Sequence, residues 1–370
     1  MMTNRTTIVQ FGTSRFLQAH ADLFFDAGTP SRSVTVVQTT GDPLRAARLT
    51  AMADPAGYPV RIRGRSSGKI IDEELRVASV TRTLSTATDW DELQRVVTHE
   101  AEFIISNTSD TGFDPKPEDG NAGPSQAQSY PAKLFHLLAA RYAAGQPPLT
   151  IFPMELIPEN GTVLKARVLH IAAKQGAADG LVAWLKTCIW ANSLVDRIVS
   201  APIEPVGAVA EPYALWAIEA QDGLTAPTSH PAIQVVPDLE QIERLKLHIL
   251  NLGHTVMAAF WMQDGSPDDL VRDLLKEKTG ARLREVFSAE VMPGFALRGL
   301  EKQATDYLDE TLDRFANPFL DHRIADIAQN HAQKIERRIA GFVNWVRDVA
   351  PDFKAPVLDA IIAGDRDERP

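Results

Sequence analysis

The chain has 370 residues, more than the roughly 250–300 residues that one hydrophobic core usually supports, so two domains are expected. Hydrophobic residues make up 44% and charged residues 23%, the balance of a soluble globular protein. The net charge of −10 and the lack of a long basic run argue against a nucleic-acid partner. A single cysteine, Cys188, excludes a disulfide framework and a thiolate metal site within one chain.

The N-terminus, MMTNRTTIVQFG, leads almost directly into a strand-like run and carries no signal-peptide pattern. The most apolar helical segment, residues 247–263, is shorter than the roughly 20 residues that a membrane span needs. We therefore expect a cytoplasmic protein without a membrane partner.

The first 40 residues predict a βαβ unit. Residues 6–12 (TTIVQFG) predict a strand that ends in a glycine, and residues 16–28 have helical spacing and end at Gly28. Residues 33–40 (SVTVVQTT) predict a second strand. A strand, a helix and a strand in this order imply a parallel sheet.

Two later segments, EFIISNTSD and LTIFPMELI, predict further strands, and the Pro/Gly-rich loop between them is long enough to indicate either function or disorder. From residue 160 onward the pattern is mostly helical, and the turn-rich residues 220–234 mark a predicted domain boundary. The expected fold is α/β. A Rossmann-like dinucleotide-binding domain (residues 1–228) precedes an α-helical substrate or catalytic domain (residues 229–370).

The segment QFGTSRFLQAH places Gly12 between the first strand and the first helix, where a dinucleotide pyrophosphate binds. Backbone N–H groups of Thr13 to Phe16 are expected to hold it. The dinucleotide fingerprint has glycine where this chain has Ser14 and Leu17, so a tight strand–helix connection without a ligand stays as the alternative.

Thr39, at the end of the second strand, and Asn107, after the strand FIIS, are the other predicted cofactor contacts. The first acid after the second strand is Asp42, with Arg45 and Arg48 further on. NAD is the expected cofactor because no arginine immediately follows this strand, and NADP is the alternative.

The segment KLHILNLGHTV raises the question of why an apolar helix carries polar groups. No charged residue occurs from Leu247 to Gln263, and burying an unpaired amide costs roughly 1–3 kcal/mol. At about 100° per residue, His254 lies about 80° and Asn251 about 140° from Lys246, so all three share one face. This polar stripe predicts a functional site. The alternative is a solvated lysine beside a hydrogen-bonded core histidine, the role expected of His248.

Two further segments carry candidate residues. In ANSLVDRIV, Asn192 is a candidate for pointing into a cleft, whereas Asp196 and Arg197 predict a structural ion pair or cap. In RFANPFLDH, Arg314 and His322 are cationic candidates for holding a substrate anion. A surface arginine beside a helix-start turn is the alternative for Arg314.

These segments, in this order, resemble the polyol-specific long-chain dehydrogenases, which include mannitol 2-dehydrogenase, fructuronate reductase and tagaturonate reductase (altronate oxidoreductase). The similar segments are QFGTSRFLQAH, SVTRTLS, SNTSDTGF, YPAKLFHLL, FPMELIPENG, NSLVDRIV, EPYALWAIE, KLHILNLGH and RFANP. Among them, SNTSDTGF, YPAKL and PMELI resemble the uronate reductases more than the mannitol dehydrogenases. The chain departs from the family at Ser14 and carries less sequence after RFANP than typical members.

The resemblance implies metal-independent, NAD(P)-dependent interconversion of a secondary alcohol and a ketone on a small sugar acid. It implies that Lys246 is the general acid/base and that Asn251 and Asn192 hold the substrate oxygen. It further implies that His254 orients the substrate, and that Arg314 and His322 contact its far end. The alternatives are a dehydrogenase for neutral polyols and a non-catalytic dinucleotide-binding redox sensor, which would not need the polar stripe.

Overall fold

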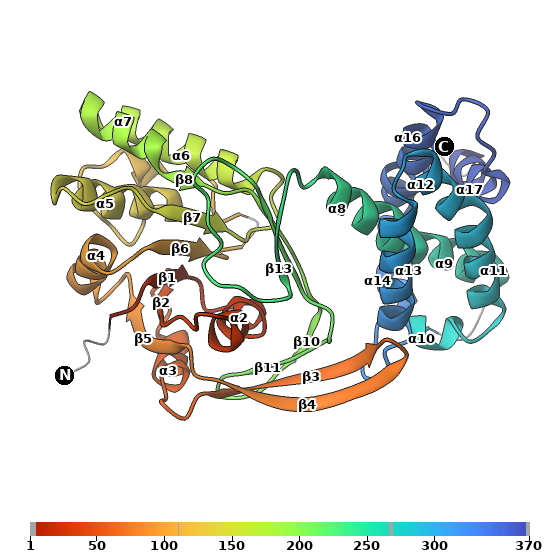
Figure 1. The fold of residues 1–370 in the computed structure, drawn as a ribbon, viewed down its shortest axis with the longest axis horizontal. Coiled ribbons are helices and arrows are strands. Elements are labelled where there is room, and N and C mark those ends of the chain that lie inside the picture. Colours follow the sequence, from red (N-terminus) through yellow and green to blue (C-terminus); the bar gives the residue numbers. More distant parts are fainter. Residues whose placement is uncertain (1–4, 110, 266–268, 368–370) are drawn as a thin grey trace. The chain divides into compact units, whose positions relative to one another are not determined.

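The computed structural model describes residues 5–109, 111–265 and 269–367, and the chain divides into two compact units (Figure 1). The first unit comprises Met1–Ile62 and Glu73–Leu239, and the second comprises Arg63–Asp72 and Glu240–Pro370. Each unit is described separately below.

A six-stranded parallel sheet forms the centre of the first unit. Its strands, in spatial order, are β5 (Val80–Ser85), β2 (Val34–Gln38), β1 (Ile8–Phe11), β6 (Phe103–Ser106), β7 (Thr150–Pro153) and β8 (Ile189–Trp190). All residues of β1, β2, β6 and β7 are buried, as expected for parallel strands that are covered on both faces. The predicted parallel, Rossmann-like sheet is confirmed. Its strand order reverses between β1 and β6, which makes the carboxyl ends of these two strands a topological switch point.

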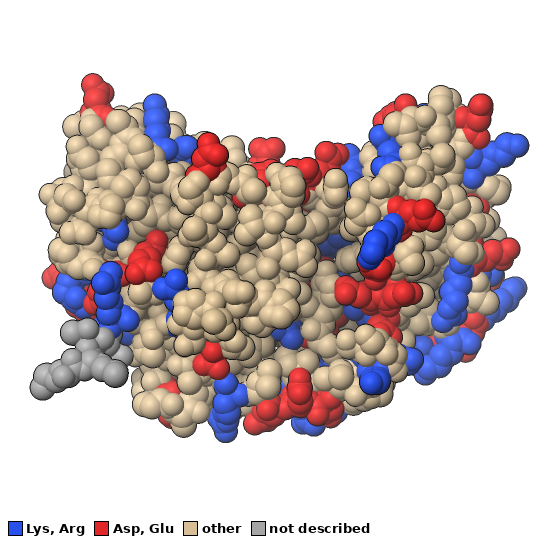
Figure 2. Space-filling view, viewed as in Figure 1, with Lys and Arg blue, Asp and Glu red and all other residues tan. Residues whose placement is uncertain are grey.

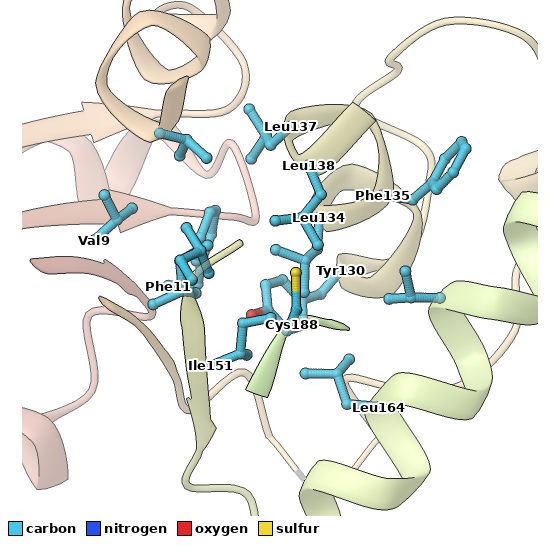
Figure 3. Close-up of a cluster of buried hydrophobic side chains, with 14 of the residues drawn as sticks. Val9, Phe11, Tyr130, Leu134, Phe135, Leu137, Leu138, Ile151, Leu164 and Cys188 are labelled. Atoms are coloured by element: carbon cyan, nitrogen blue, oxygen red, sulfur yellow. The ribbon is translucent and has the colours of Figure 1, made fainter. Parts of the chain in front are cut away.

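Helices of the first unit cover this sheet, and they are α1 (Arg15–Gln18), α2 (Ala21–Ala27), α3 (Pro43–Met52), α4 (Trp90–His99), η1 (Pro117–Gly120), α5 (Tyr130–Ala143), α6 (Asn160–Lys174) and α7 (Asp179–Thr187). Helix α5 packs between α4 and α6. Figure 3 shows its apolar side chains facing β1 and β7, where Leu134 and Leu138 meet Phe11 and Ile151. This contact anchors β1, which ends directly before the predicted cofactor residue Gly12.

The predicted helix over residues 16–28 is wrong in one respect, because it is broken at Ala19 and His20. The guanidinium of Arg197 donates to the Ala19 carbonyl at 2.6 Å, which ends α1. His20 is fully buried and its Nε2 lies 2.9 Å from the Leu215 carbonyl. Arg197 also donates twice to the Glu211 carbonyl. Its role is therefore structural, as predicted.

Residues 189–236 correct the prediction of a mostly helical region after residue 160. They form short strands in two further sheets. One has the order β10 (Val199–Pro202), β11 (Ala208–Ala210), β3 (Tyr58–Ser66) and β4 (Lys69–Val77), and the other β13 (Ile233–Val236), β12 (Leu215–Glu219) and β9 (Ser193–Asp196). Strands of three to five residues are too short to show a clear alternation in the sequence.

The second unit is helical, as predicted. Its helices are α8 (Glu240–Leu245), η2 (Lys246–Asn251), α9 (Leu252–Asp264), α10 (Val271–Leu274), α11 (Lys278–Val286), η3 (Phe287–Val291), α12 (Met292–Leu297), α13 (Glu301–Phe315), α14 (Ile324–Ala328), α15 (His331–Lys334), η4 (Ile335–Ala340), α16 (Gly341–Arg347) and α17 (Pro356–Asp367). Three of these segments, η2, η3 and η4, are π-helical. Such insertions are rare and are often found at functional sites.

Among the described residues, no helix is long and apolar enough to cross a membrane. On the face of the molecule drawn in Figure 2, basic and acidic side chains are both spread widely over the surface. The net charge of −10 is therefore not gathered into one patch on this face.

Candidate functional site

The turn after β1 requires glycine at position 12. Gly12 has φ +123°, and a Cβ there would lie 2.5 Å from the carbonyl oxygen of Asn107. Two backbone hydrogen bonds fix this approach, from Gly12 N to the Val37 carbonyl (3.0 Å) and from Asn107 N to the Phe11 carbonyl (2.9 Å). The turn thus lies against the end of β6, at the switch point of the sheet, where backbone can approach a ligand closely.

Ser14 links this turn to helix α1 and to the end of strand β6. Its hydroxyl caps α1 by accepting from Leu17 N at 3.2 Å, and it donates to Asn107 Oδ1 at 3.1 Å. The Asn107 amide in turn donates to the Met154 carbonyl at 2.8 Å. The structure therefore brings Gly12, Ser14 and Asn107 together. Serine replaces the fingerprint glycine and takes on a cap and a cross-link of its own.

The remaining predicted cofactor residues are Thr13, Phe16 and Thr39, and they make different contacts from those of Gly12, Ser14 and Asn107. The Thr13 carbonyl accepts from Gln18 Nε2 at 3.4 Å, and the Phe16 ring stacks on His20 at a centroid distance of 4.6 Å. The Thr39 carbonyl, at the end of β2, accepts hydrogen bonds from three side chains, those of Thr86, Gln126 and Lys133.

Lys133 was not anticipated as a feature of this region. It is only 3% exposed, and its ammonium group also donates to the carbonyls of Gln126 (2.9 Å) and Gln128 (3.0 Å). Burial lowers its pKa to about 8. These contacts hold residues 126–128 of the Pro/Gly-rich loop against the end of β2. The lysine of the YPAKL segment is the sequence signal that could have shown this.

Glu155 is a second residue that sequence reasoning missed. It is 2% exposed, and its carboxylate accepts from the Ser106 hydroxyl (3.1 Å) and from the backbone and hydroxyl of Thr108 (2.9 Å each). Burial raises the pKa of this carboxyl group. Hydrogen bonds therefore join the SNTSDTGF and PMELI segments, and they hold the carboxyl ends of β6 and β7 together beside Asn107.

Asn192, a predicted catalytic residue, is half-buried in the first unit. Its Oδ1 accepts from Thr162 N at 3.0 Å near the start of α6, and its Nδ2 donates to Glu219 Oε2 at 2.7 Å. One N–H hydrogen of the amide remains without a partner among the described residues. The adjacent Ser193 backbone is held on both sides by the Asn160 amide. Asn192 is thus a rigidly held N–H donor.

In the second unit, Lys246 and Asn251 are the first and last residues of the π-helical segment η2, and both are half-buried. A π-helical turn bonds residue i to residue i+5, so these two side chains come closer to one face than regular α-helical spacing allows. The prediction from α-helical geometry, an offset of about 140°, therefore overstates their separation. Lys246 and Asn251 therefore lie closer together around the helix axis than the sequence indicated.

His254 lies one turn further along, in α9, and is 7% exposed. Its Nε2 is buried and has no hydrogen-bond partner among the described residues. The ring packs on Phe315 (4.3 Å between centroids) and meets the His322 ring edge to face at 4.9 Å. Burial, followed by the nearby charges of His322, Arg314, Arg338 and Lys334, lowers its pKa well below the usual value. The imidazole is therefore neutral near pH 7.

The structure also brings Arg314 and His322 to this histidine. Arg314, near the end of α13, is only 6% exposed, which excludes the surface arginine considered as its alternative. His322 is half-buried, and burial lowers its pKa. By contrast, His248 has the structural role predicted for it, with Nδ1 3.1 Å from the Arg338 carbonyl and its ring stacked on Trp345.

The second unit therefore carries Lys246, Asn251, His254, Arg314 and His322, while the first unit brings together Gly12, Ser14 and Asn107 and also carries Asn192. No group of three or more His, Cys, Asp or Glu side chains in the described part of the chain is placed to hold a metal ion. Chemically, these second-unit residues offer one amine, one amide, one guanidinium and two imidazoles whose pKa is lowered, a set suited to proton transfer and to an anionic ligand.

The sequence matches the mannitol dehydrogenase Rossmann domain over residues 6–229 and the mannitol dehydrogenase C-terminal domain over residues 238–364. It is 29% identical to an altronate oxidoreductase of Bacillus subtilis, over 90% of this chain and 73% of that protein. It is 30% identical to an altronate oxidoreductase of Bacteroides thetaiotaomicron, over 90% of this chain and 74% of that protein.

Two solved structures share the fold. The substrate-free form of D-sorbitol dehydrogenase has a TM-score of 0.77 at 19% identity, over 92% of this chain and 75% of that one. Mannitol 2-dehydrogenase of Pseudomonas fluorescens, in a ternary complex with NAD and D-mannitol, has a TM-score of 0.71 at 19% identity, over 97% and 78%. Both agree with a Rossmann-like unit followed by a helical one.

Proposed function

Because this chain belongs to the mannitol dehydrogenase family, we propose that it is an NAD-dependent oxidoreductase that interconverts a secondary alcohol and a ketone on a sugar acid. The altronate oxidoreductases among its relatives favour a hexuronate or aldonate substrate over a neutral polyol. The observation that carries the proposal is the polar face formed by Lys246, Asn251 and His254. There the buried Nε2 of His254 has no hydrogen-bond partner in the described part of the chain, and cationic side chains lie nearby.

The switch point of the sheet fits a dinucleotide. Gly12 lets the turn lie against the Asn107 carbonyl, which any side chain would meet, and backbone N–H groups of Thr13 to Phe16 are the proposed donors to the pyrophosphate. Thr39 and Asn107, at the ends of β2 and β6, are the other proposed cofactor contacts. We favour NAD over NADP because no arginine immediately follows β2.

When bound, the nicotinamide ring accepts a hydride from the carbinol carbon or returns it to the ketone. In oxidation, the Lys246 amine takes the hydroxyl proton of the substrate, and in reduction it returns that proton. Asn251 and Asn192 donate amide N–H groups to the oxygen as its negative charge develops, and removal of one such donor typically costs about 10²–10³ in rate. His254 orients the substrate through Nε2, and Arg314 and His322 contact its far end.

A substrate panel tests this proposal. Altronate, other aldonates, hexuronates and neutral hexitols are assayed with NAD and with NADP by the absorbance of the reduced nicotinamide. We expect turnover of a sugar acid with NAD. If calorimetry shows that neither dinucleotide binds, the protein is not an oxidoreductase of this kind. If dinucleotide binds but no substrate turns over, a redox sensor becomes the better description.

A further inference from the structure

Two cations that the proposed mechanism does not use lie beside the polar face of the second unit. Lys334, the last residue of α15, and Arg338, in η4, are four residues apart and both half-buried. Segment η4 packs against both η2 and α9. Between them in the sequence, Glu336 and Arg337 are exposed, so the two cations occupy the face that packs inward.

Hydrogen bonds fix the two charged groups in place. Arg338 Nη1 donates to the Asn251 carbonyl (3.3 Å) and to the Thr255 hydroxyl (3.1 Å), which places the guanidinium on the turn between Asn251 and His254. Lys334 Nζ donates to the Ile327 carbonyl at 2.7 Å. These are neutral acceptors, so they satisfy donors without balancing charge. The Nε and Nη2 groups of this guanidinium have no hydrogen-bond partner in the part of the chain that the structure describes.

Two carboxylates of the second unit interact with other cations. Glu310 interacts electrostatically with Arg314, and Asp326 with His322. No carboxylate in the described part of the second unit forms a salt bridge with Lys334 or Arg338, and each instead experiences a neighbouring positive charge. Like charges four residues apart destabilise a helix, and a partly desolvated cation without a counter-ion is costly. An anion bound between the two cations would offset this cost.

We propose that Lys334 and Arg338 bind the carboxylate of the sugar acid and thereby set the preference of the enzyme for acids over neutral polyols. The inference rests on the proposed function. A planar guanidinium matches a carboxylate with two parallel N–H donors, and the adjacent ammonium adds a point charge. Because Arg338 is bonded to the turn that carries Asn251, the same contact positions the acid end of the substrate relative to the amide that holds its reacting oxygen.

The test compares one acid with the matching uncharged molecule, in Lys334→Gln and Arg338→Gln. Altronate and altritol differ in whether one terminal carbon is a carboxylate or a CH₂OH group. We expect each variant to raise KM for altronate by about 10- to 100-fold more than KM for altritol, the usual range for a lost charge-assisted hydrogen bond. Arg337→Gln is the matched control, because it removes the same charge from an exposed position on the same segment.

Three results would overturn the inference while leaving the proposed function intact. One is an equal rise in KM for both substrates, and another is an equal effect of Arg337→Gln. A third is tighter wild-type binding of a hexitol phosphate than of altronate, which would assign the site to a phosphate. If Arg338→Gln fails to fold, Lys334→Gln and Arg338→Lys still decide the question. A wild-type protein that turns over neither altronate nor altritol refutes the proposed function and this inference with it.

Discussion

Replacing Gly12 by alanine tests the cofactor site most directly. The new Cβ would lie 2.5 Å from the Asn107 carbonyl oxygen, and real Cβ atoms essentially never approach closer than 3.0 Å, so the turn must move by at least 0.5 Å. The carbonyl cannot yield easily, because Asn107 is bonded through its backbone to Phe11 and through its amide to the Met154 carbonyl. The φ of +123° adds strain of order 1–3 kcal/mol for a residue with a side chain.

Displacement of the turn relieves this strain, and it also moves the backbone N–H groups of Thr13 to Phe16 that are proposed to face the pyrophosphate. We therefore expect Gly12→Ala to raise the Kd for NAD by about 10- to 100-fold, which corresponds to roughly 1.4–2.8 kcal/mol. Isothermal titration calorimetry measures this Kd, and thermal unfolding measures the accompanying change in stability.

Gly145→Ala is the matched control. Gly145 also has a positive φ, +68°, but a Cβ there would meet nothing within 4 Å. This variant should lose about 1 kcal/mol of stability from backbone strain and keep the wild-type affinity for NAD. An NAD affinity of Gly12→Ala within threefold of wild type, together with a stability loss like that of Gly145→Ala, would refute the assignment of this turn to the cofactor.

Three other predictions concern the catalytic lysine, the substrate's far end and a buried carboxyl group. Lys246→Ala should lower turnover by roughly 10²–10⁴ with little change in dinucleotide affinity, and a variant with more than a tenth of wild-type turnover would contradict the proposed role. Arg314→Lys should weaken substrate binding although it keeps the charge, because a planar fork is lost, and unchanged kinetics would remove Arg314 from the site. Burial raises the pKa of Asp22 from 3.8 to about 7, with Tyr58 donating to it at 2.7 Å. The folded state therefore binds the extra proton, and this group's stabilising effect is full below about pH 4 and is lost as the pH rises to about 7. In urea titrations, Asp22→Asn should gain stability relative to wild type from pH 5 to pH 8, by roughly 2–3 kcal/mol, because about two pH units of this window lie below the folded pKa. If the difference in unfolding free energy between the two proteins is constant over that range, this titration is excluded. The difference also cancels the contributions of other groups that titrate in both proteins, such as His20, whose pKa burial lowers to about 3.

Local patterns in the sequence were sufficient for the general architecture. Apolar runs such as TTIVQFG and SVTVVQTT, each beside a glycine or a helix, predicted the parallel sheet because strands buried on both faces need continuous hydrophobic residues. The polar residues of KLHILNLGHTV likewise stood out, since each is costly in an otherwise apolar helix. Together with the order of the family's segments, they predicted a Rossmann-like unit followed by a helical one.

Other features depend on residues that are far apart in the chain, so no local pattern shows them. The strands over residues 189–236 are too short to alternate visibly, and they exist because β12 pairs with β9 and β13, and β11 pairs with β3. The bond between Glu155 and the Ser106–Thr108 segment joins residues almost 50 positions apart. A contact of this kind depends on the sheet register, which only the folded chain establishes.

The sequence by itself determined which residue types are available for the chemistry, namely a lysine, two asparagines and a histidine at family-specific spacing. The tertiary structure alone decided how they are arranged. The π-helical turn, with its i to i+5 bonding, brings Asn251 toward Lys246, and this segment packs against α13 and η4, which are distant from it in the sequence. The same packing places Lys334 and Arg338 beside that face, and their uncompensated charge became visible only when the positions of the neighbouring carboxylates were known.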